Sequence, residues 1–465
     1  MKFTDNKVEG LKLAYIGGGS RGWAWTLMRE LALASDISGD VYLYDIDYPA
    51  AQKNEIIGNK FNSAKDANSV WNYKAVDTID KALTGADFII ISILPGTLDE
   101  MDSDVHTPEK YGIYQSVGDT VGPGGIVRAM RTVPMFEYIA EQIKQYCPNA
   151  WVINYTNPMT ICVKTLYRVF PEIKAFGCCH EVFGTQKLLA HIIEKKLGIE
   201  NIAREEIKVN PLSVNHFTWV TKATYRNMDL FPLYREFCEE NPEGIDSDTP
   251  IDSNWFNRTA GKTAEKVKFD LFRRFGYIAA AGDRHLAEFC EGKWYLENPE
   301  RVDEMKFALT PVAARRESLV SRLEKSENLA SGKEEPLVYR TGEEGVNQIR
   351  ALLGLHDLVT NVNLPNMGQI PNLPLGAVVE TNAVFRSDSV TPVFAGPVPA
   401  EIHGLVSRVC LEQENLDSAI AQRDVEKIFE VFSNDALVTC NLADARKLFD
   451  EMVDNTKKYL TMYDI

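Results

Sequence analysis

Short apolar runs alternate with longer stretches of helix-forming residues over positions 1–197 of the chain. The runs 11–16, 41–44 and 88–94 are predicted strands, and the last of them is apolar at almost every position. A continuous apolar run is typical of a strand that is buried on both faces of a sheet. Alternation of strands with helices is typical of a parallel sheet that helices cover on both sides. We therefore expect residues 1–197 to form one doubly wound α/β domain.

The pattern changes after residue 197. Positions 208–225 predict a pair of strands, and a helical central region follows. Pro-rich loops are expected at positions 364–399, and amphipathic helices at positions 401–459. A chain of 465 residues is long for a single hydrophobic core. We therefore expect residues 198–465 to form a second domain, mixed α/β and largely helical, with a helical C-terminus.

A glycine-rich turn lies between the first predicted strand and a predicted helix. Gly17 permits a tight turn, Gly19 lets backbone N–H groups approach a pyrophosphate, and Gly22 lets the helix pack closely. Ser20 lies in the same turn, and Asp45 ends the next predicted strand, where a ribose-binding carboxylate is expected. These five residues predict a Rossmann-type domain that binds NAD. A glycine-rich turn in another kind of βαβ protein is the alternative.

A second glycine-rich segment, Gly118-Asp-Thr-Val-Gly-Pro-Gly-Gly125, precedes a predicted helix. Its composition fits a mobile loop over the cofactor. It fits a long surface connection equally well, and the sequence does not decide between the two.

The formal net charge of −16 argues against binding to nucleic acids or to anionic membranes. The apolar runs are too short to span a bilayer, and residues 1–7 lack the features of a secretory signal. The eight cysteines are therefore expected as free thiols of a cytoplasmic protein. A small anionic substrate is compatible with this charge, because local cations can line a pocket.

Cysteine and histidine residues stand at the ends of predicted strands. Cys179-His180-Glu181 follows one strand, and Asn215-His216 lies in a second strand-rich segment. A thiolate and an imidazole could hold a divalent metal ion while leaving positions open for substrate oxygens. Cys179 could equally act as a nucleophile, and a lone histidine such as His216 is often a hydrogen-bonded core residue. Spacing alone leaves these alternatives open.

The chain resembles glycoside hydrolase family 4, the NAD- and metal-dependent glycosidases, along most of its length. The stretches that carry the resemblance are Ile16–Ser20, Lys110–Gly112, Gly118–Gly125, Asn154–Pro158, Cys179–Val182, Asn215–His216 and Phe275–Glu288. Cys-His-Glu-Val at positions 179–182 resembles the α-galacturonidase subgroup, whereas the α-glucosidases and α-galactosidases of the family usually carry Cys-His-Ser-Val. The resemblance implies a domain arrangement like that of lactate and malate dehydrogenases.

The reaction that the resemblance implies is an elimination assisted by NAD, and not the usual two-carboxylate hydrolysis. The cofactor would oxidise C3 of the sugar, a base would remove the C2 proton, and the C1–O bond would then break. A divalent ion, Mn²⁺ by resemblance, would stabilise the charge that develops on the sugar oxygens. Cys179 and His216 are its implied ligands.

Other residues receive roles by the same resemblance. Tyr277 is the candidate base and His180 the candidate acid, although Tyr277 could also be a packing residue. Arg284 would bind a uronate carboxylate, since melibiase-like relatives carry glutamate there; a surface arginine paired with a neighbouring acid is the alternative. The implied substrate-binding residues are Asn154, Glu181, Arg284 and His285. For Asn154, an Asx-turn is the alternative.

We therefore expect a cytoplasmic, homo-oligomeric (dimeric or tetrameric) glycosidase that cleaves small oligogalacturonides or other α-glycosides, with no nucleic-acid or membrane partner. An α-glucosidase or α-galactosidase of the same mechanism is the second candidate. A metal-independent hydroxy-acid dehydrogenase is a further alternative, but it has no obvious use for Cys179-His180. A non-catalytic NAD sensor is another, but it has no use for His216 and Tyr277 together.

Overall fold

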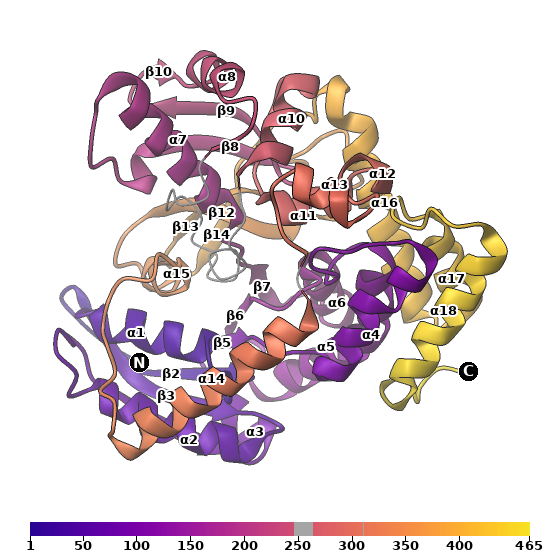
Figure 1. The fold of residues 1–465 in the computed structure, drawn as a ribbon. Helices are drawn as coiled ribbons and strands as arrows, with labels where there is room; N and C mark the ends of the chain where they lie inside the picture. Colours follow the sequence, from indigo (N-terminus) through magenta and orange to yellow (C-terminus); the bar gives the residue numbers. More distant parts are fainter. Residues whose placement is uncertain (246–263, 310) are drawn as a thin grey trace.

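A long, mixed β-sheet runs through the centre of the molecule (Figure 1). The computed structural model describes residues 1–245, 264–309 and 311–465. Within these residues the sheet order is β14-β13-β12-β7-β6-β5-β2-β3-β4, with β1 paired to β2. Its strands are β1 (Lys2–Thr4), β2 (Lys7–Ile16), β3 (Ile37–Tyr44), β4 (Trp71–Val76), β5 (Phe88–Ile91), β6 (Trp151–Asn154), β7 (Lys174–Gly177), β12 (Leu358–Pro365), β13 (Val378–Arg386) and β14 (Ser389–Pro392). Strands β2 to β7 are mutually parallel, whereas β12, β13 and β14 run antiparallel to their neighbours.

Helices connect the parallel strands and cover the sheet, as the alternating pattern predicts. They are α1 (Trp23–Leu33), α2 (Tyr48–Phe61), α3 (Ile79–Leu83), α4 (Leu98–His106), the 3₁₀ helix η1 (Pro108–Tyr111), α5 (Gly122–Tyr146), α6 (Met159–Val169) and α7 (Glu181–Leu197). The strand order reverses between β2 and β5, and ligands of such sheets bind at this switch point, beyond the carboxyl ends of the strands. The Rossmann-type α/β fold is confirmed.

A small antiparallel sheet packs beside the first (Figure 1). Its strands are β8 (Ile207–Leu212), β9 (Trp219–Tyr225), β10 (Met228–Asp229) and β11 (Ile278–Ala279). Helices α8 (Phe231–Glu240) and α10 (Lys266–Phe275) lie against it, together with α7. The pairing of β8 with β9 confirms the two strands expected at positions 208–225.

The remaining elements are mostly helical. They are the 3₁₀ helices η2 (Arg204–Glu206) and η3 (Lys457–Tyr459), and the α-helices α11 (Asp283–Phe289), α12 (Gly292–Tyr295), α13 (Pro299–Glu304), α14 (Val312–Ser331), α15 (Gly345–Leu352), α16 (Ala400–Ala421), α17 (Val425–Asn434) and α18 (Leu442–Thr456). Helix α14 runs from α4 to α2 across the parallel-sheet half of the molecule (Figure 1). In the described parts of the chain no helix has the length and apolar character of a membrane span.

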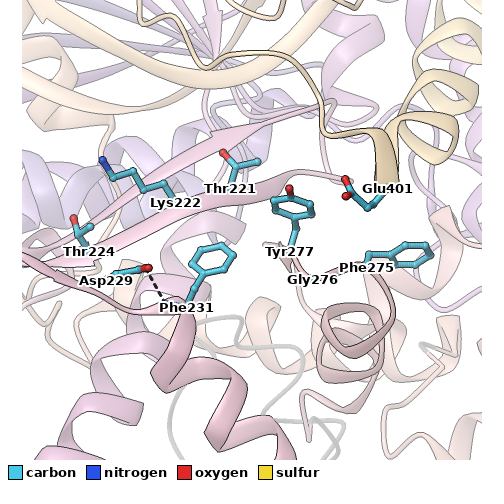
Figure 2. A pocket seen from close by; sticks show the side chains of 9 residues that line it. All are labelled: Thr221, Lys222, Thr224, Asp229, Phe231, Phe275, Gly276, Tyr277 and Glu401. Atoms are coloured by element: carbon cyan, nitrogen blue, oxygen red, sulfur yellow. Dashed lines mark hydrogen bonds between the residues drawn. The ribbon is translucent and has the colours of Figure 1, made fainter.

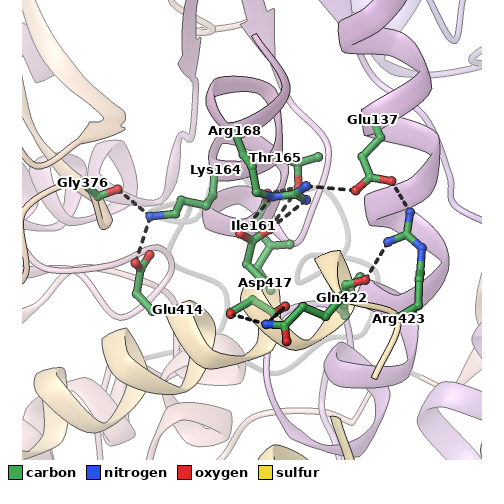
Figure 3. A network of polar contacts seen from close by, with 12 residues as sticks. Glu137, Ile161, Lys164, Thr165, Arg168, Gly376, Glu414, Asp417, Gln422 and Arg423 are labelled. Atoms are coloured by element: carbon green, nitrogen blue, oxygen red, sulfur yellow. Dashed lines mark hydrogen bonds and ion pairs between the residues drawn. The ribbon is translucent and has the colours of Figure 1, made fainter. Parts of the chain in front are cut away.

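Ion pairs tie the C-terminal helices to the parallel-sheet half (Figure 3). Arg168 of α6 contacts both Glu137 of α5 and Asp417 of α16, at 3.0 and 3.3 Å. Lys164, one turn earlier on α6, donates to Glu414 of α16 and to the carbonyl of Gly376. Arg423, after α16, closes the network by pairing with Glu137.

One expectation from the sequence was wrong, and one of two open alternatives is excluded. Positions 364–399 are not loops throughout, because β13 and β14 lie there and extend the central sheet. Residues 118–125 are not a surface connection: most of them are buried, and α5 begins at Gly122. The boundary at residues 197 and 198 stays a prediction, and the central sheet takes strands from both sides of it.

Candidate active site

The glycine-rich turn connects β2 to α1 at the switch point of the sheet. Gly17 has φ +92°, and a Cβ on it would lie 2.0 Å from the carbonyl oxygen of Ser92. A Cβ on Gly19 would lie 2.9 Å from Asp45 Oδ2. Only glycine fits at these two positions, for the conformation of the first and for the space around both. The turn therefore brings bare backbone to the edge of the sheet, where a dinucleotide phosphate binds in such folds.

Asp45 lies directly against this turn, as the spacing predicts. Its Oδ2 accepts a hydrogen bond from Gly19 N at 2.8 Å, and its Oδ1 accepts one from Asp47 N at 2.9 Å. A cation also borders the turn: Arg322 Nη1 of α14 is 3.2 Å from the position that a Cβ on Gly22 would take. A guanidinium at a helix N-terminus adds positive charge where phosphates bind.

A cluster of histidines and carboxylates lies beyond the strand ends. Within the described residues, Asp119, His216 and His285 bring one ligand atom each to within 4.8 Å of one another. The imidazoles of His216 and His285 stack with their ring centroids 4.3 Å apart. Imidazole and carboxylate are ligands that Mn²⁺ accepts, so the donor set fits a divalent ion. His216 was predicted as a metal ligand, His285 was predicted to contact substrate, and Asp119 was not singled out.

Burial and neighbouring charges keep two members of this cluster, His216 and Asp119, in their ligating forms. Burial, assisted by His285, lowers the pKa of His216 to about 3, so its ring is neutral and keeps a lone pair. Burial opposes the ionisation of Asp119, but His285 and Arg128 outweigh it and hold its pKa well below the usual range. Asp119 Oδ2 also accepts a hydrogen bond from Asn157 Nδ2 at 3.0 Å.

Glu181 extends the cluster towards His180. Its carboxylate accepts a hydrogen bond from Gly282 N at 2.9 Å and lies 3.8 Å from His285 Nε2 and 3.7 Å from His180 Nε2. Burial opposes its ionisation, but His285, His180 and His216 together lower its pKa to about 2. Glu181 is next to His180 in the sequence, and the fold brings His285 to the same carboxylate.

His180 lies between two carboxylates. Its Nδ1 is 3.5 Å from Glu343 Oε1, and its Nε2 faces Glu181. The ring also packs near Trp23, with centroids 5.9 Å apart, and is partly exposed. Glu343 comes from the segment before α15 and was missed in the sequence, because 163 positions separate it from His180.

Cys179 is buried at the end of β7, outside the group formed by Asp119, His216 and His285. Burial raises the pKa of its thiol well above the ordinary value, and the carboxylates of Glu380 and Glu181 act in the same direction. A contact with the Asn215 side chain has the opposite effect on the thiol. Asn215 directly precedes His216, so its side chain connects Cys179 with the chain segment that carries His216.

Asn154 occupies the end of β6 with its polar atoms engaged. Its Oδ1 accepts a hydrogen bond from Thr156 N and its Nδ2 donates to Thr156 O, both at 3.0 Å. This is the Asx-type turn that the sequence offered as the alternative to substrate contact.

Arg284 is buried and is not the surface residue that the alternative interpretation assumed. Its Nε donates to Ala308 O at 3.1 Å, and its Nη2 donates to Ser116 O at 2.9 Å. The Ser116 hydroxyl in turn donates to Arg284 O. This guanidinium holds two chain segments together, and its contact with a substrate carboxylate stays a prediction.

Tyr277 lines a cavity of about 490 Å³ on the small sheet (Figure 2). Figure 2 shows its ring between Thr221 and Glu401, with Phe275 close by. Burial and the Glu401 carboxylate raise the pKa of Tyr277. The lining of this cavity does not include Asp119, His216 or His285. The role of Tyr277 as the base stays a prediction.

Two site residues beyond Asp119 escaped the sequence interpretation. Glu380 was assigned to a loop, and the apolar positions on both sides of it in β13 were the signal for a buried strand. Asp119 stands in a segment that was noted for its glycines, and the acid among them was the signal for a ligand. For Glu343 no sequence signal existed.

Models of two families match the chain. "Family 4 glycosyl hydrolase" matches residues 12–195, and "Family 4 glycosyl hydrolase C-terminal domain" matches residues 213–438. The chain is 59% identical to the alpha-galacturonidase of Thermoanaerobacterium saccharolyticum, over 100% of both chains. It is 50% identical to the alpha-galacturonidase of Bacillus subtilis, over 97% of this chain and 98% of that one.

Solved structures agree with these matches. The crystal structure of lplD from Bacillus subtilis superimposes with a TM-score of 0.90 at 50% identity, over 96% of this chain and 100% of that one. A 6-phospho-alpha-glucosidase from gut microorganisms, solved with NAD and Mn²⁺, has a TM-score of 0.78 at 20% identity, over 97% and 99% of the two chains. The latter likeness concerns the fold.

Proposed function

The chain belongs to glycosyl hydrolase family 4 and is a glycosidase, and from that premise we propose that its substrates are α-galacturonides. The observation that carries this proposal is the identity of 50–59% with relatives named alpha-galacturonidase, over nearly the whole of each chain. Glu181 is the residue of Cys-His-Glu-Val by which the chain resembles the α-galacturonidase subgroup. It lies within the histidine and carboxylate cluster, near His180 and His285.

We propose that NAD binds on the glycine-rich turn, with Gly19 facing the pyrophosphate and Asp45 the ribose. The bare backbone of the turn and the carboxylate beside it support this placement. We also propose a divalent ion, Mn²⁺, held by His216 together with Asp119 and His285, with Cys179 as the ligand that the family resemblance adds. When bound, the two groups supply hydride transfer at C3 and stabilisation of negative charge on sugar oxygens.

The residues around these groups act on the glycosidic bond. His180 would give the leaving oxygen its proton, because its two ring nitrogens lie near the carboxyl groups of Glu181 and Glu343, which can orient the ring. Glu181 would orient His180 and His285 towards one substrate. The remaining predicted contacts, Asn154 and Arg284 to the sugar and Tyr277 to the C2 proton, are kept as proposals for direct test.

Hydrolysis of nitrophenyl α-galacturonide, α-glucoside and α-galactoside, with NAD⁺ and Mn²⁺ supplied, tests the function. We expect turnover of the galacturonide to exceed that of the other two by at least tenfold, and incorporation of solvent deuterium at C2. The Tyr277→Phe variant should lose the deuterium incorporation if this hydroxyl is the base. Preferred turnover of a neutral glycoside would contradict the substrate assignment, and stoichiometric release of NADH would indicate a dehydrogenase instead.

A further inference from the structure

A buried carboxylate connects the strand end that carries Cys179 with the loop that carries His216. Glu380, on β13, is 1% exposed. Its Oε2 accepts hydrogen bonds from the Thr218 hydroxyl and from Asn215 Nδ2, the latter at 3.2 Å. Its Oε1 accepts one from Asn361 Nδ2 at 2.7 Å. Both oxygens of this carboxylate are therefore used within the protein.

On one side, these hydrogen bonds hold the loop of His216. Asn215 and Thr218 lie before and after His216 in the sequence, and both donate to the same oxygen of Glu380. The backbone N–H of Glu380 donates to Ser213 O at 2.8 Å, which ties the start of the same loop to β13. Three contacts from one residue thus fix the course of the chain around the His216 imidazole.

On the other side, the contacts reach Cys179. Asn361 Nδ2 donates two hydrogen bonds. One goes to Glu380 Oε1, and the other goes to the carbonyl of Cys179 at 3.1 Å. The Asn215 amide, also bound to Glu380, contacts the Cys179 side chain. Two asparagines therefore connect one carboxylate to Cys179, one through its backbone and one through its thiol.

We propose that Glu380 is a positioning residue that sets the place of His216 relative to Cys179, and that a divalent ion binds weakly without it. The inference rests on the proposed function, since it takes His216 as a ligand of the ion. Outer-shell partners of metal ligands typically change metal affinity about 10–100-fold. A glutamine has the size of Glu380, but its amide N–H₂ would face donors where the native oxygen accepts. The three donors then cannot all be satisfied.

The test is a titration of the NAD⁺-bound full-length chain with Mn²⁺, followed by the electron paramagnetic resonance of free Mn²⁺. We expect Glu380→Gln to raise the Kd for Mn²⁺ about tenfold or more. The Kd for NAD⁺ should change less than twofold, because the described hydrogen-bond partners of Glu380 and Asn361 include no residue of the glycine-rich turn. Asp417→Asn is the matched control: this carboxylate is 3% exposed and pairs with Arg168 away from the site, so Mn²⁺ affinity should stay at the wild-type value.

His216→Ala separates the inference from the function on which it rests. Loss of Mn²⁺ binding in His216→Ala with wild-type affinity in Glu380→Gln would overturn the role of Glu380 alone. Wild-type affinity in His216→Ala would overturn the proposed metal site and the role of Glu380 with it. If Glu380→Gln does not fold, Asn361→Ala is the second variant: it keeps the Glu380 carboxylate and removes the hydrogen bonds by which Asn361 connects it to the Cys179 carbonyl. An unchanged Kd in that folded variant would then count against the proposal, and a severalfold weaker one would support it.

Discussion

Single residues in this site have partners that the sequence does not bring near them. His180 lies near two carboxyl groups, that of its sequence neighbour Glu181 and that of the distant Glu343. His216 lies near His285 and Asp119. Such groups change one another's pKa values because burial removes the water that would otherwise screen them. Roles implied by the family resemblance, such as those of Asn154 and Arg284, depend on whether the polar atoms of these side chains already have partners in the protein.

Replacement of Arg284 decides between a structural and a substrate-binding role. In Arg284→Met the carbonyls of Ser116 and Ala308 lose charged donors. We expect the free energy of unfolding to fall by about 2–4 kcal/mol, measured by urea denaturation. Wild-type stability combined with a loss of galacturonide turnover would instead place this guanidinium at the substrate carboxylate.

At the scale of elements, short polar contacts define where helices begin. Helix α4 starts with a capping box in which Glu100 Oε2 accepts from the backbone N and the hydroxyl of Thr97. The other carboxylate oxygen pairs at 2.7 Å with Lys458 of η3, near the C-terminus. One side chain therefore caps a helix and attaches the C-terminal segment to it.

This cap makes the stability depend on pH. Burial opposes the ionisation of Glu100, but Lys458 and Thr97 outweigh it and lower its pKa to about 2. The stabilisation is thus present above the ordinary pKa of a glutamate and is lost as the pH falls from about 4.5 towards 2. We expect Glu100→Gln to cost about 1–2 kcal/mol at pH 7. Thermal unfolding of both proteins between pH 7 and 3 should show this difference shrinking; a constant difference would contradict the assignment.

At the scale of the whole molecule, the two sheets meet at the site. The glycine-rich turn belongs to the central sheet, whereas His216 and His285 come from segments next to the small sheet. A ligand that contacts both parts stabilises their association, because it binds the folded chain and not the unfolded one.

We therefore expect NAD⁺ and Mn²⁺ to raise the unfolding temperature. At 100 times its Kd, each ligand adds about 2.7 kcal/mol, which corresponds to a shift of several degrees. In His216→Ala the shift with Mn²⁺ should disappear while the shift with NAD⁺ stays, as followed by differential scanning calorimetry. A Mn²⁺ shift that survives this substitution would point to ligands elsewhere in the chain.

The sequence by itself determined the features that depend on neighbours along the chain. The apolar runs predicted the parallel sheet. The glycine-rich turn and Asp45 predicted a dinucleotide site, since strand, turn and helix of a βαβ unit follow one another within about 30 residues. Short motifs between Ile16 and Glu288 carried the family resemblance. The assignment of His216 to a group of possible metal ligands also came from the sequence.

Only the tertiary structure decided which distant side chains meet. Strand β13 was predicted as part of a loop because prolines stand on both sides of it in the sequence. Its pairing with β12 places Glu380 next to Asn361, which contacts Cys179, and Glu380 also binds Asn215, which precedes His216. Glu343 and Asp119 reach the site from segments far from the residues they contact. Such pairings depend on sheet order and packing, which form by burial of apolar surface and are not encoded in the spacing of any local motif.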